Sequence, residues 1–321
     1  MTRDTVLKAV SVALAVARSR WTRWIVGGLA AALAVWAVAV EWDAVVGALG
    51  RLDPAALVLA LVATAGNLVL AGAMWRVALA DLGSRLGWAT AARVYFVGQV
   101  GKYIPGSVWP MIMQAELASD HGVPRRRSAT ASAVSLLFAV ASGMLVVLVA
   151  LPFVPDVLPD QLRAAALLIV PLAVVLHPSV FGRLADTGLR LIGRDPLEHW
   201  TSLRGTLVAI AWGAGSWAFA GLQVFALAVP LGAPADARTL VLCLGGYALA
   251  WALGFLVFMA PAGVGAREFA LAAVLSTVLG TGEVVVVVLV SRVMFTVADL
   301  AAAGVGMGLG RWVRNRPVAV S

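Results

Sequence analysis

The stretch from Val284 to Leu309, VVVVVLVSRVMFTVADLAAAGVGMGL, decides the fold class. It exceeds the roughly 20 apolar residues that a helix needs to cross the hydrocarbon of a bilayer. Its charges, Arg292 and Asp299, are two helical turns apart and share a face with Phe295 and Thr296. A charge at the bilayer centre costs about 2.5 to 3.5 kcal/mol on insertion scales, so both should face the protein interior. They either form a structural polar pair between helices or line a site for a lipid head group.

The composition of the whole chain agrees with a membrane protein. Hydrophobic residues make up 62% of the 321 residues and charged residues only 12%, and the mean hydropathy is +0.96. We expect an all-α polytopic bundle of about eight spans plus a re-entrant broken-helix segment, in a single integral membrane domain over residues 1–321. The expected spans are Trp24–Val40, Pro54–Leu79, Ala129–Leu151, Ala164–Phe181, Gly205–Val229, Thr239–Ala260, Val264–Leu279 and Val284–Leu309.

Basic residues set the predicted orientation, because cytoplasmic loops of membrane proteins are enriched in Lys and Arg. With the N-terminus inside, most of the 24 basic residues fall on the inner side, including the Arg125 to Arg127 cluster, while the outer loops are acidic. We expect a multi-pass protein of the plasma or inner membrane with both termini in the cytoplasm. Residues 1–23 are predicted to form a cytoplasmic interfacial helix. A signal peptide cleaved after Ala39 is the alternative, which the long basic region before the first apolar run disfavours.

The segment 87–117 is apolar but interrupted by glycine and proline. If it crossed the membrane completely, the Arg125 to Arg127 cluster would lie outside, so we interpret it as two half-helices that re-enter from the cytoplasmic side. Its centre is predicted to bind a lipid phosphate at a helix N-terminus next to a lysine. The alternative is a structural kink with a lysine that snorkels to the interface. The candidate residues are Gln99, Lys102, Tyr103, Pro105, Gly106 and Ser107, with Ser107 able to cap the next helix.

A second break, in segment 261–282, has the same Pro-x-Gly pattern before a helix and is expected at the inner end of that helix. Arg267 is placed to meet a phosphate, and Glu268 in the first turn suits the helix dipole. A glycine-rich nucleotide loop is a weak alternative, because no strand precedes it and the spacing matches no nucleotide fingerprint. Two broken helices in the two halves of a chain are typical of transporter sites. The candidate residues are Pro261, Gly263, Gly265, Arg267 and Glu268.

The remaining polar and small residues have structural interpretations. Asn67 and Gln223, each in an apolar span, are expected to make hydrogen bonds between helices. Gly304 and Gly308, with Gly306 and Gly310, form small-xxx-small pairs that favour helix packing and offer a contact for a homodimer. No catalytic motif is present, and the sequence predicts no metal site, no cofactor and no nucleic-acid partner.

The motifs GQVGKYIPGSVW (residues 98–109), the basic turn with Arg125 to Arg127 and PAGVGAREF (residues 261–269) together resemble the lysylphosphatidylglycerol synthase/flippase transmembrane family. The resemblance implies a polytopic bundle with re-entrant segments, whose best-known members flip aminoacylated phospholipid between leaflets. It also implies that residues of both motifs line or shape the lipid pathway. The aminoacyl-transferase domain of large members is missing, so the resemblance does not imply lipid synthesis.

We therefore expect a flippase-like protein that binds a phospholipid or polyprenyl-linked lipid and translocates it between leaflets. Its partners should be membrane lipids with anionic or phosphate head groups. Since no nucleotide site is visible, transport would run downhill or be coupled to an ion or proton. Two alternatives stay open at this point: a membrane enzyme or subunit that presents a lipid for glycosyl or aminoacyl transfer, and a structural scaffold of a membrane complex.

Overall fold

The computed structural model describes residues 42–103, 108–153, 180, 183, 186–187, 200–256 and 265–314. All regular structure in these residues is helical, which confirms the all-α prediction for this part of the chain. The long helices are α4 (Pro54–Asp81), α7 (Arg125–Ala150), α11 (Leu203–Ala228), α12 (Ala237–Leu256) and α14 (Thr281–Arg314). The shorter elements are α3 (Trp42–Leu49), α5 (Trp88–Gln99), η1 (Val100–Tyr103), α6 (Trp109–Ser119), η2 (Leu151–Phe153), η4 (Val229–Leu231) and α13 (Ala266–Leu275).

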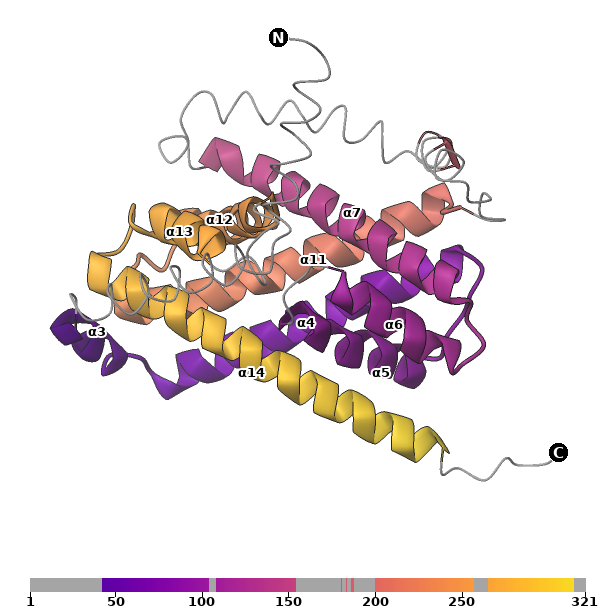
Figure 1. Ribbon diagram of the computed structural model, residues 1–321. Coiled ribbons are helices and arrows are strands. Elements are labelled where there is room, and N and C mark those ends of the chain that lie inside the picture. Colours follow the sequence, from indigo (N-terminus) through magenta and orange to yellow (C-terminus); the bar gives the residue numbers. More distant parts are fainter. Residues whose placement is uncertain are drawn as a thin grey trace, which may run out of the picture.

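Five helices of the described residues are long and apolar enough to cross a membrane. They are α4, α7, α11 with η4, α12 and α14, and they match five of the predicted spans. The predicted span Trp24–Val40 lies outside the described residues, as do the interfacial helix 1–23 and nearly all of Ala164–Phe181. In Figure 1, α14 runs across the front of the bundle from α3 to the C-terminal end, with α4 and α11 behind it.

The prediction of a complete span over Val264–Leu279 is wrong. Helix α13 has only 10 residues, so it is about 15 Å long and cannot cross about 30 Å of hydrocarbon. It begins after Gly265, whose φ of 94° favours glycine, and it ends where Ser276 and Thr277 bond back to carbonyls of its last turn. The chain then turns directly into α14, so α13 and α14 form a helical hairpin.

The most extensive helix contact joins α4 and α11. The Asn67 amide donates to the Ser216 carbonyl at 2.9 Å and to the Ser216 hydroxyl at 2.8 Å, and that hydroxyl donates back to the Asn67 carbonyl. Gly66 lets Phe219 pack where a Cβ would have to stand 2.4 Å from its ring. The predicted interhelical role of Asn67 is confirmed. Gln223 does the same for α11 and α14, since it accepts from the Ser291 hydroxyl at 2.9 Å.

Helices α5 and α6 form a second, tighter hairpin. A Cβ on Gly98 would lie 2.4 Å from Gln114, and one on Gly101 would lie 2.8 Å from Pro110, so the two helices run antiparallel in close contact. Neither helix is long enough to span a bilayer. The side chain of Arg127, at the start of α7, bonds the Gly83 carbonyl at 3.1 Å, next to the end of α4. The segment therefore returns to the end of the bundle from which it began.

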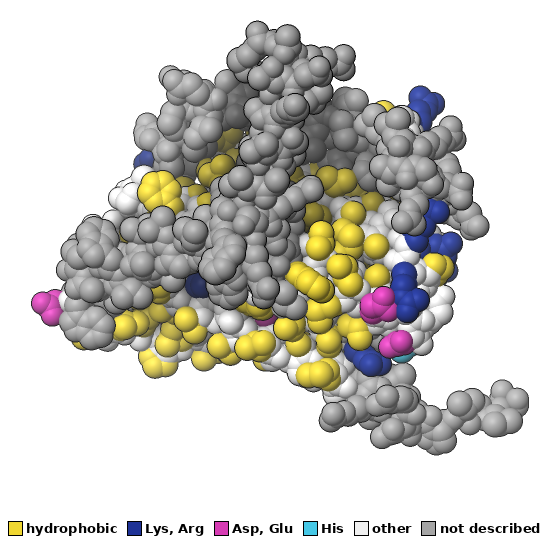
Figure 2. Space-filling model, viewed as in Figure 1, with side chains coloured by type: hydrophobic (Ala, Val, Ile, Leu, Met, Phe, Trp, Pro, Cys, Tyr) yellow, Lys and Arg dark blue, Asp and Glu magenta, His cyan; other side chains and the backbone are white. Residues whose placement is uncertain are grey.

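Charged side chains gather at the ends of the bundle, with apolar surface between them. Figure 2 shows dark blue side chains at the end that carries the start of α7, next to a broad yellow band. Arg125 binds Glu116 at this end, and at the opposite end Arg51 binds Glu283 at the start of α14. This separation gives the described helices the polar, apolar, polar profile of a bilayer-spanning bundle.

Candidate functional site: a charged junction

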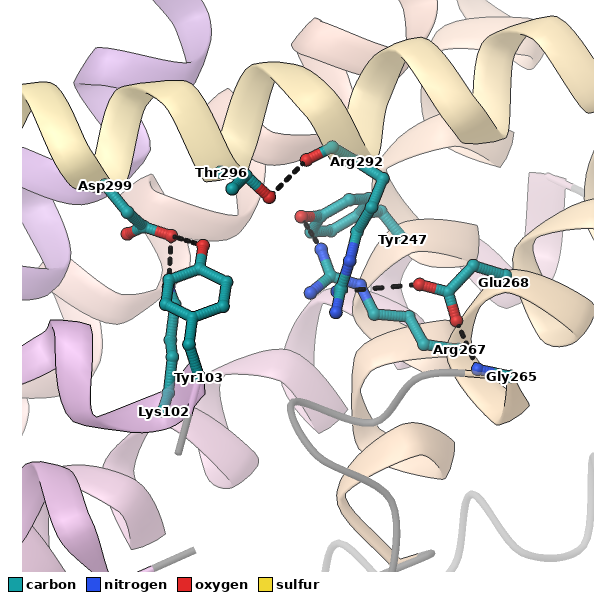
Figure 3. Close-up of polar contacts among 9 residues, drawn as sticks. All are labelled: Lys102, Tyr103, Tyr247, Gly265, Arg267, Glu268, Arg292, Thr296 and Asp299. Carbon is teal, nitrogen blue, oxygen red and sulfur yellow. Dashed lines mark hydrogen bonds and ion pairs between the residues drawn. The ribbon is translucent and has the colours of Figure 1, made fainter. Parts of the chain in front are cut away.

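Charged side chains from three separate segments meet near the middle of α14. In Figure 3, Lys102 and Tyr103 of η1 point to Asp299 of α14, and Arg267 and Glu268 of α13 lie at Arg292, two turns earlier on the same helix. We call this cluster the charged junction and define it by three cations, two carboxylates and two tyrosines. They are Lys102, Arg267, Arg292, Glu268, Asp299, Tyr103 and Tyr247.

Asp299 is held by two residues of η1. The Lys102 Nζ lies 2.5 Å from its Oδ2, and the Tyr103 hydroxyl donates to the same oxygen at 2.6 Å. The 3-10 turn after α5 brings both donors to α14. The Asp299 side chain is 3% exposed and the Lys102 side chain 32% exposed, so the carboxylate is more fully enclosed than the lysine that binds it.

Glu268 connects α13 to α14. Its Oε2 accepts the backbone N–H of Gly265 at 2.7 Å, which caps the first turn of α13, and its Oε1 lies 3.5 Å from the Arg292 guanidinium. A carboxylate in the first turn is also favoured by the helix dipole, as the sequence predicted. Both members of the Arg292–Glu268 pair are 25% exposed. The pair is therefore accessible although it lies halfway along a membrane-spanning helix.

Arg267 is bound differently from the other two cations. Its guanidinium donates to the Tyr247 hydroxyl and lies 4.6 Å from the Tyr247 ring centroid and 5.5 Å from that of Phe295. These are cation–π contacts. Lys102 and Arg292 each pair with a carboxylate, whereas no carboxylate among the described residues forms an ion pair with Arg267. The Arg267 Cβ lies close to Gly254 of α12, where an added Cβ would stand only 2.9 Å from it.

The junction has one more positive than negative charge, because three cations face two carboxylates. Arg267 interacts electrostatically with Arg292 as well as with Glu268 and Asp299, and Lys102 interacts with both arginines. Like charges repel each other, most strongly where water is scarce. An anion bound among them would relieve this repulsion, and a guanidinium offers a phosphate two parallel donors.

Most of the described candidates from the sequence belong to this junction. Lys102, Tyr103, Gly265, Arg267, Glu268, Arg292 and Asp299 come together. Gln99 does not join them directly, because it hydrogen bonds the Tyr95 side chain on its own helix. Pro105, Gly106, Ser107, Pro261 and Gly263 lie outside the described residues.

Two local predictions need correction. The N-cap of α6 is Val108, which makes no side-chain cap, so the helix begins one residue later than capping by Ser107 required. The start of α13 lies against Arg292 near the middle of α14, not at the inner end of a helix. The physical reason is the shortness of α13, which leaves its first turn at mid-depth.

Tyr247 of α12 is the site residue that sequence reasoning missed. The chain has only 3 tyrosines, and all lie in or next to the junction: Tyr103 and Tyr247 bond its charges, and Tyr95 interacts electrostatically with Asp299. A phenol in an otherwise apolar helix was the available signal, because a buried Tyr hydroxyl normally finds a hydrogen-bond partner.

Comparison with known protein families gives one match. The family model described as the lysylphosphatidylglycerol synthase TM region matches residues 24–303, which include every residue of the charged junction. No curated protein matches the sequence. The family match covers most of the chain and confirms the resemblance carried by the two glycine-containing motifs.

Proposed function

The chain belongs to the lysylphosphatidylglycerol synthase transmembrane family and is a multi-pass membrane protein, and from this premise we propose that it is a lipid flippase. In this proposal the charged junction binds the phosphate of a phospholipid or a polyprenyl-linked lipid. The protein then moves that lipid between the two leaflets. The lipid is the substrate, and no covalent change to it is required.

One observation carries the proposal: the excess positive charge at mid-depth. Ionisable residues inside membrane-spanning helices are rare and mark substrate pathways. The three cations come from η1, α13 and α14, and η1 is far from the other two in the sequence. One of the cations, Arg267, forms no ion pair with a carboxylate of the described residues. A lipid phosphate is the anion that a membrane supplies in abundance. In this proposal it lies between Arg267 and the partly exposed side chains of Lys102 and Arg292.

The placement of the junction suits movement between leaflets. The η1 turn reaches it from the end of the bundle that carries Arg125, and α13 reaches it from the end that carries Glu283. A head group bound there is distant from both surfaces. We extend the proposal to re-entry of segment 87–117 from the cytoplasm and to cytoplasmic termini, on the strength of the basic residues near the start of α7.

The test is lipid translocation by the purified protein in liposomes. Phosphatidylglycerol and a polyprenyl phosphate, each with a fluorescent head group, would be followed with an impermeant reductant that bleaches the outer leaflet. We expect translocation of at least one of them, and a loss of about tenfold or more in Arg267→Gln, because a charged hydrogen bond to phosphate is worth roughly 1.5 to 3 kcal/mol. The control is Arg51→Gln, which removes an arginine from the ion pair at the end of α14.

Translocation that survives Arg267→Gln unchanged would contradict the head-group role of the junction. Absence of translocation for both lipids by folded wild-type protein would favour a subunit that presents lipid to a transferase.

A scaffold role is the second candidate, favoured by the glycines of α14. A Cβ on Gly304 or Gly308 would meet nothing within 4 Å, whereas one on Gly306 would meet the Arg93 backbone at 3.2 Å. Gly306 thus packs inside the chain, while Gly304 and Gly308 leave room for another helix. We propose a homodimer through these two glycines. Loss of activity in Gly308→Leu with retention in Arg267→Gln would move the assignment from flippase to scaffold.

A further inference from the structure

The excess positive charge of the junction resides on one side chain. Lys102 binds Asp299 with a nitrogen–oxygen distance of 2.5 Å, and Arg292 binds Glu268 at 3.5 Å. Each pair consists of one cation and one carboxylate and so has no net charge. Arg267 is the third cation, and among the described residues it forms no ion pair with a carboxylate. An anion with a single negative charge would therefore make the whole junction neutral.

Arg267 is held by groups that leave its charge in place. The Tyr247 hydroxyl accepts from one of the five N–H donors that a guanidinium carries. The rings of Tyr247 and Phe295 attract the guanidinium, but a ring has no net charge and cannot neutralise it. The residue is also partly exposed. A phosphate with two oxygens for two parallel N–H groups is the anion that this arrangement fits.

An amine has no corresponding partner in the junction. Asp299 is 3% exposed and already accepts from two donors of η1. Glu268 accepts the Gly265 N–H on one oxygen and has the other against Arg292. An ammonium group in the junction would either displace Arg292 from Glu268 or lie next to cations. Both arrangements are unfavourable, because like charges repel most strongly where little water screens them.

We propose that the junction selects a lipid whose head group is a phosphodiester with one negative charge and no amine. The inference rests on the proposed function and names the substrate class of that site. Phosphatidylglycerol fits this description, as does a polyprenyl phosphate esterified to a neutral sugar. Phosphatidylethanolamine and aminoacylated phosphatidylglycerol do not fit it, because their amines add positive charge. The selection follows from the charge of the head group and not from the hydrocarbon chain.

The experiment measures competition for binding to the purified full-length protein in a nonionic detergent. Radiolabelled phosphatidylglycerol is the probe, and the unlabelled competitors are phosphatidylglycerol, phosphatidylethanolamine and lysylphosphatidylglycerol with the same acyl chains. The first and last share the phosphodiester and differ only by the lysyl ester, whose amines are cationic. We expect both amine-bearing lipids to compete at least tenfold more weakly than phosphatidylglycerol. Deacylated phosphatidylglycerol should also compete weakly, because hydrocarbon chains hold a lipid in the detergent around the helices.

A matched pair of variants at Thr296 of α14 tests the charge argument. Figure 3 places this side chain between those of Arg292 and Asp299, so a longer side chain there reaches the junction. Thr296→Glu adds a carboxylate that offsets the charge of Arg267 and gives an amine a partner, whereas Thr296→Gln has nearly the same shape without the charge. We expect radiolabelled lysylphosphatidylglycerol to bind Thr296→Glu at least tenfold more tightly than Thr296→Gln. A gain of binding cannot come from misfolding.

Equal or stronger competition by either amine-bearing lipid in the wild-type protein would overturn the inference. Absence of saturable phosphatidylglycerol binding would overturn it too, as would competition by the deacylated compound equal to that of the lipid. The same holds if Thr296→Glu shows no gain while unfolding at the same temperature as Thr296→Gln. Selective binding without translocation would instead contradict flipping and leave the lipid class established. Translocation of phosphatidylglycerol and lysylphosphatidylglycerol at equal rates would retain flipping and overturn the selection.

Discussion

The α4–α11 interface and the charged junction bury polar groups in opposite ways. In the interface, the polar groups of Asn67 and Ser216 are neutral and satisfy each other, and glycine lets the helices pack without space. In the junction, charges face one another, positive charge is in excess, and the Lys102 and Arg292 side chains remain 32% and 25% exposed. The polar groups of the interface already satisfy each other, so the interface only holds helices together. The junction has excess positive charge and partly exposed cations, which a bound anion would neutralise.

In the proposed function, this contrast lets one membrane protein be both stable and able to bind a lipid head group. Packing and neutral hydrogen bonds in the α4–α11 interface give stability that needs no ligand. Charges in the junction are tolerated because carboxylates neutralise two of the three cations. Perturbing the two regions should therefore separate stability from transport.

The largest effect should come from breaking the most enclosed charge pair of the junction. Lys102→Met leaves Asp299 buried with the Tyr103 hydroxyl as a donor. Removing one partner of a buried pair costs about 3 to 5 kcal/mol, so we expect a loss of that order in the free energy of unfolding. Reversible unfolding in mixed micelles measures it.

The matching control is the double variant Lys102→Met with Asp299→Asn, which removes both charges. It should recover most of the lost stability but none of the transport. If Lys102→Met cost less than Asn67→Ala, whose hydrogen bonds are worth about 0.6 kcal/mol on average in a membrane protein, the contrast between the regions would be wrong.

A smaller effect is expected from overpacking the contact between α11 and α12. A Cβ on Gly221 would lie 2.4 Å from the Leu244 Cα of α12, so Gly221→Ala must push two helices apart. Overpacking costs about 1 to 3 kcal/mol, which the same unfolding measurement detects. Gly47→Ala is the control, since its Cβ would meet nothing within 4 Å. Equal losses in both variants would show that close packing does not explain the effect.

The smallest effect is expected from an ion pair at the surface, between Arg125 and Glu116. Arg125 binds Glu116 at 2.8 Å, nearly as closely as Lys102 binds Asp299, but both side chains are more than half exposed. The hydrogen bond from Arg125 holds the pKa of Glu116 below its ordinary value. A depressed carboxyl pKa stabilises the fold above the unfolded pKa, and this contribution disappears as pH falls through the folded pKa.

Glu116→Gln should therefore be slightly less stable than wild type near neutral pH and equal to it in acid below the folded pKa. High salt should also reduce the difference, because exposed charges are screened. A loss comparable to that of Lys102→Met would mean that exposure does not govern the strength of these pairs.

Several features of the site could be predicted from the sequence. Arg292 and Asp299 had to face protein because hydrocarbon excludes charge, and their spacing put them on one face. Glycine and proline marked both breaks that lead into the junction. Tyr247 was missed because a phenol in an apolar helix signals a hydrogen-bond partner, but the sequence around it does not identify which residue that partner is. The length of α13 was missed because the apolar run from Val264 to Leu279 continues past the end of the helix.

The sequence by itself determined the membrane class, the long spans among the described residues, the family and the inward direction of the α14 charges. These properties depend on composition and periodicity, which are local along the chain. Only the tertiary structure decided that Asp299 binds Lys102 and Tyr103, nearly 200 positions earlier, and that Arg267 is held by aromatic rings. These contacts depend on how the helices pack against each other. Packing brings together residues that are far apart in the sequence, and a hydropathy pattern does not predict which of them meet.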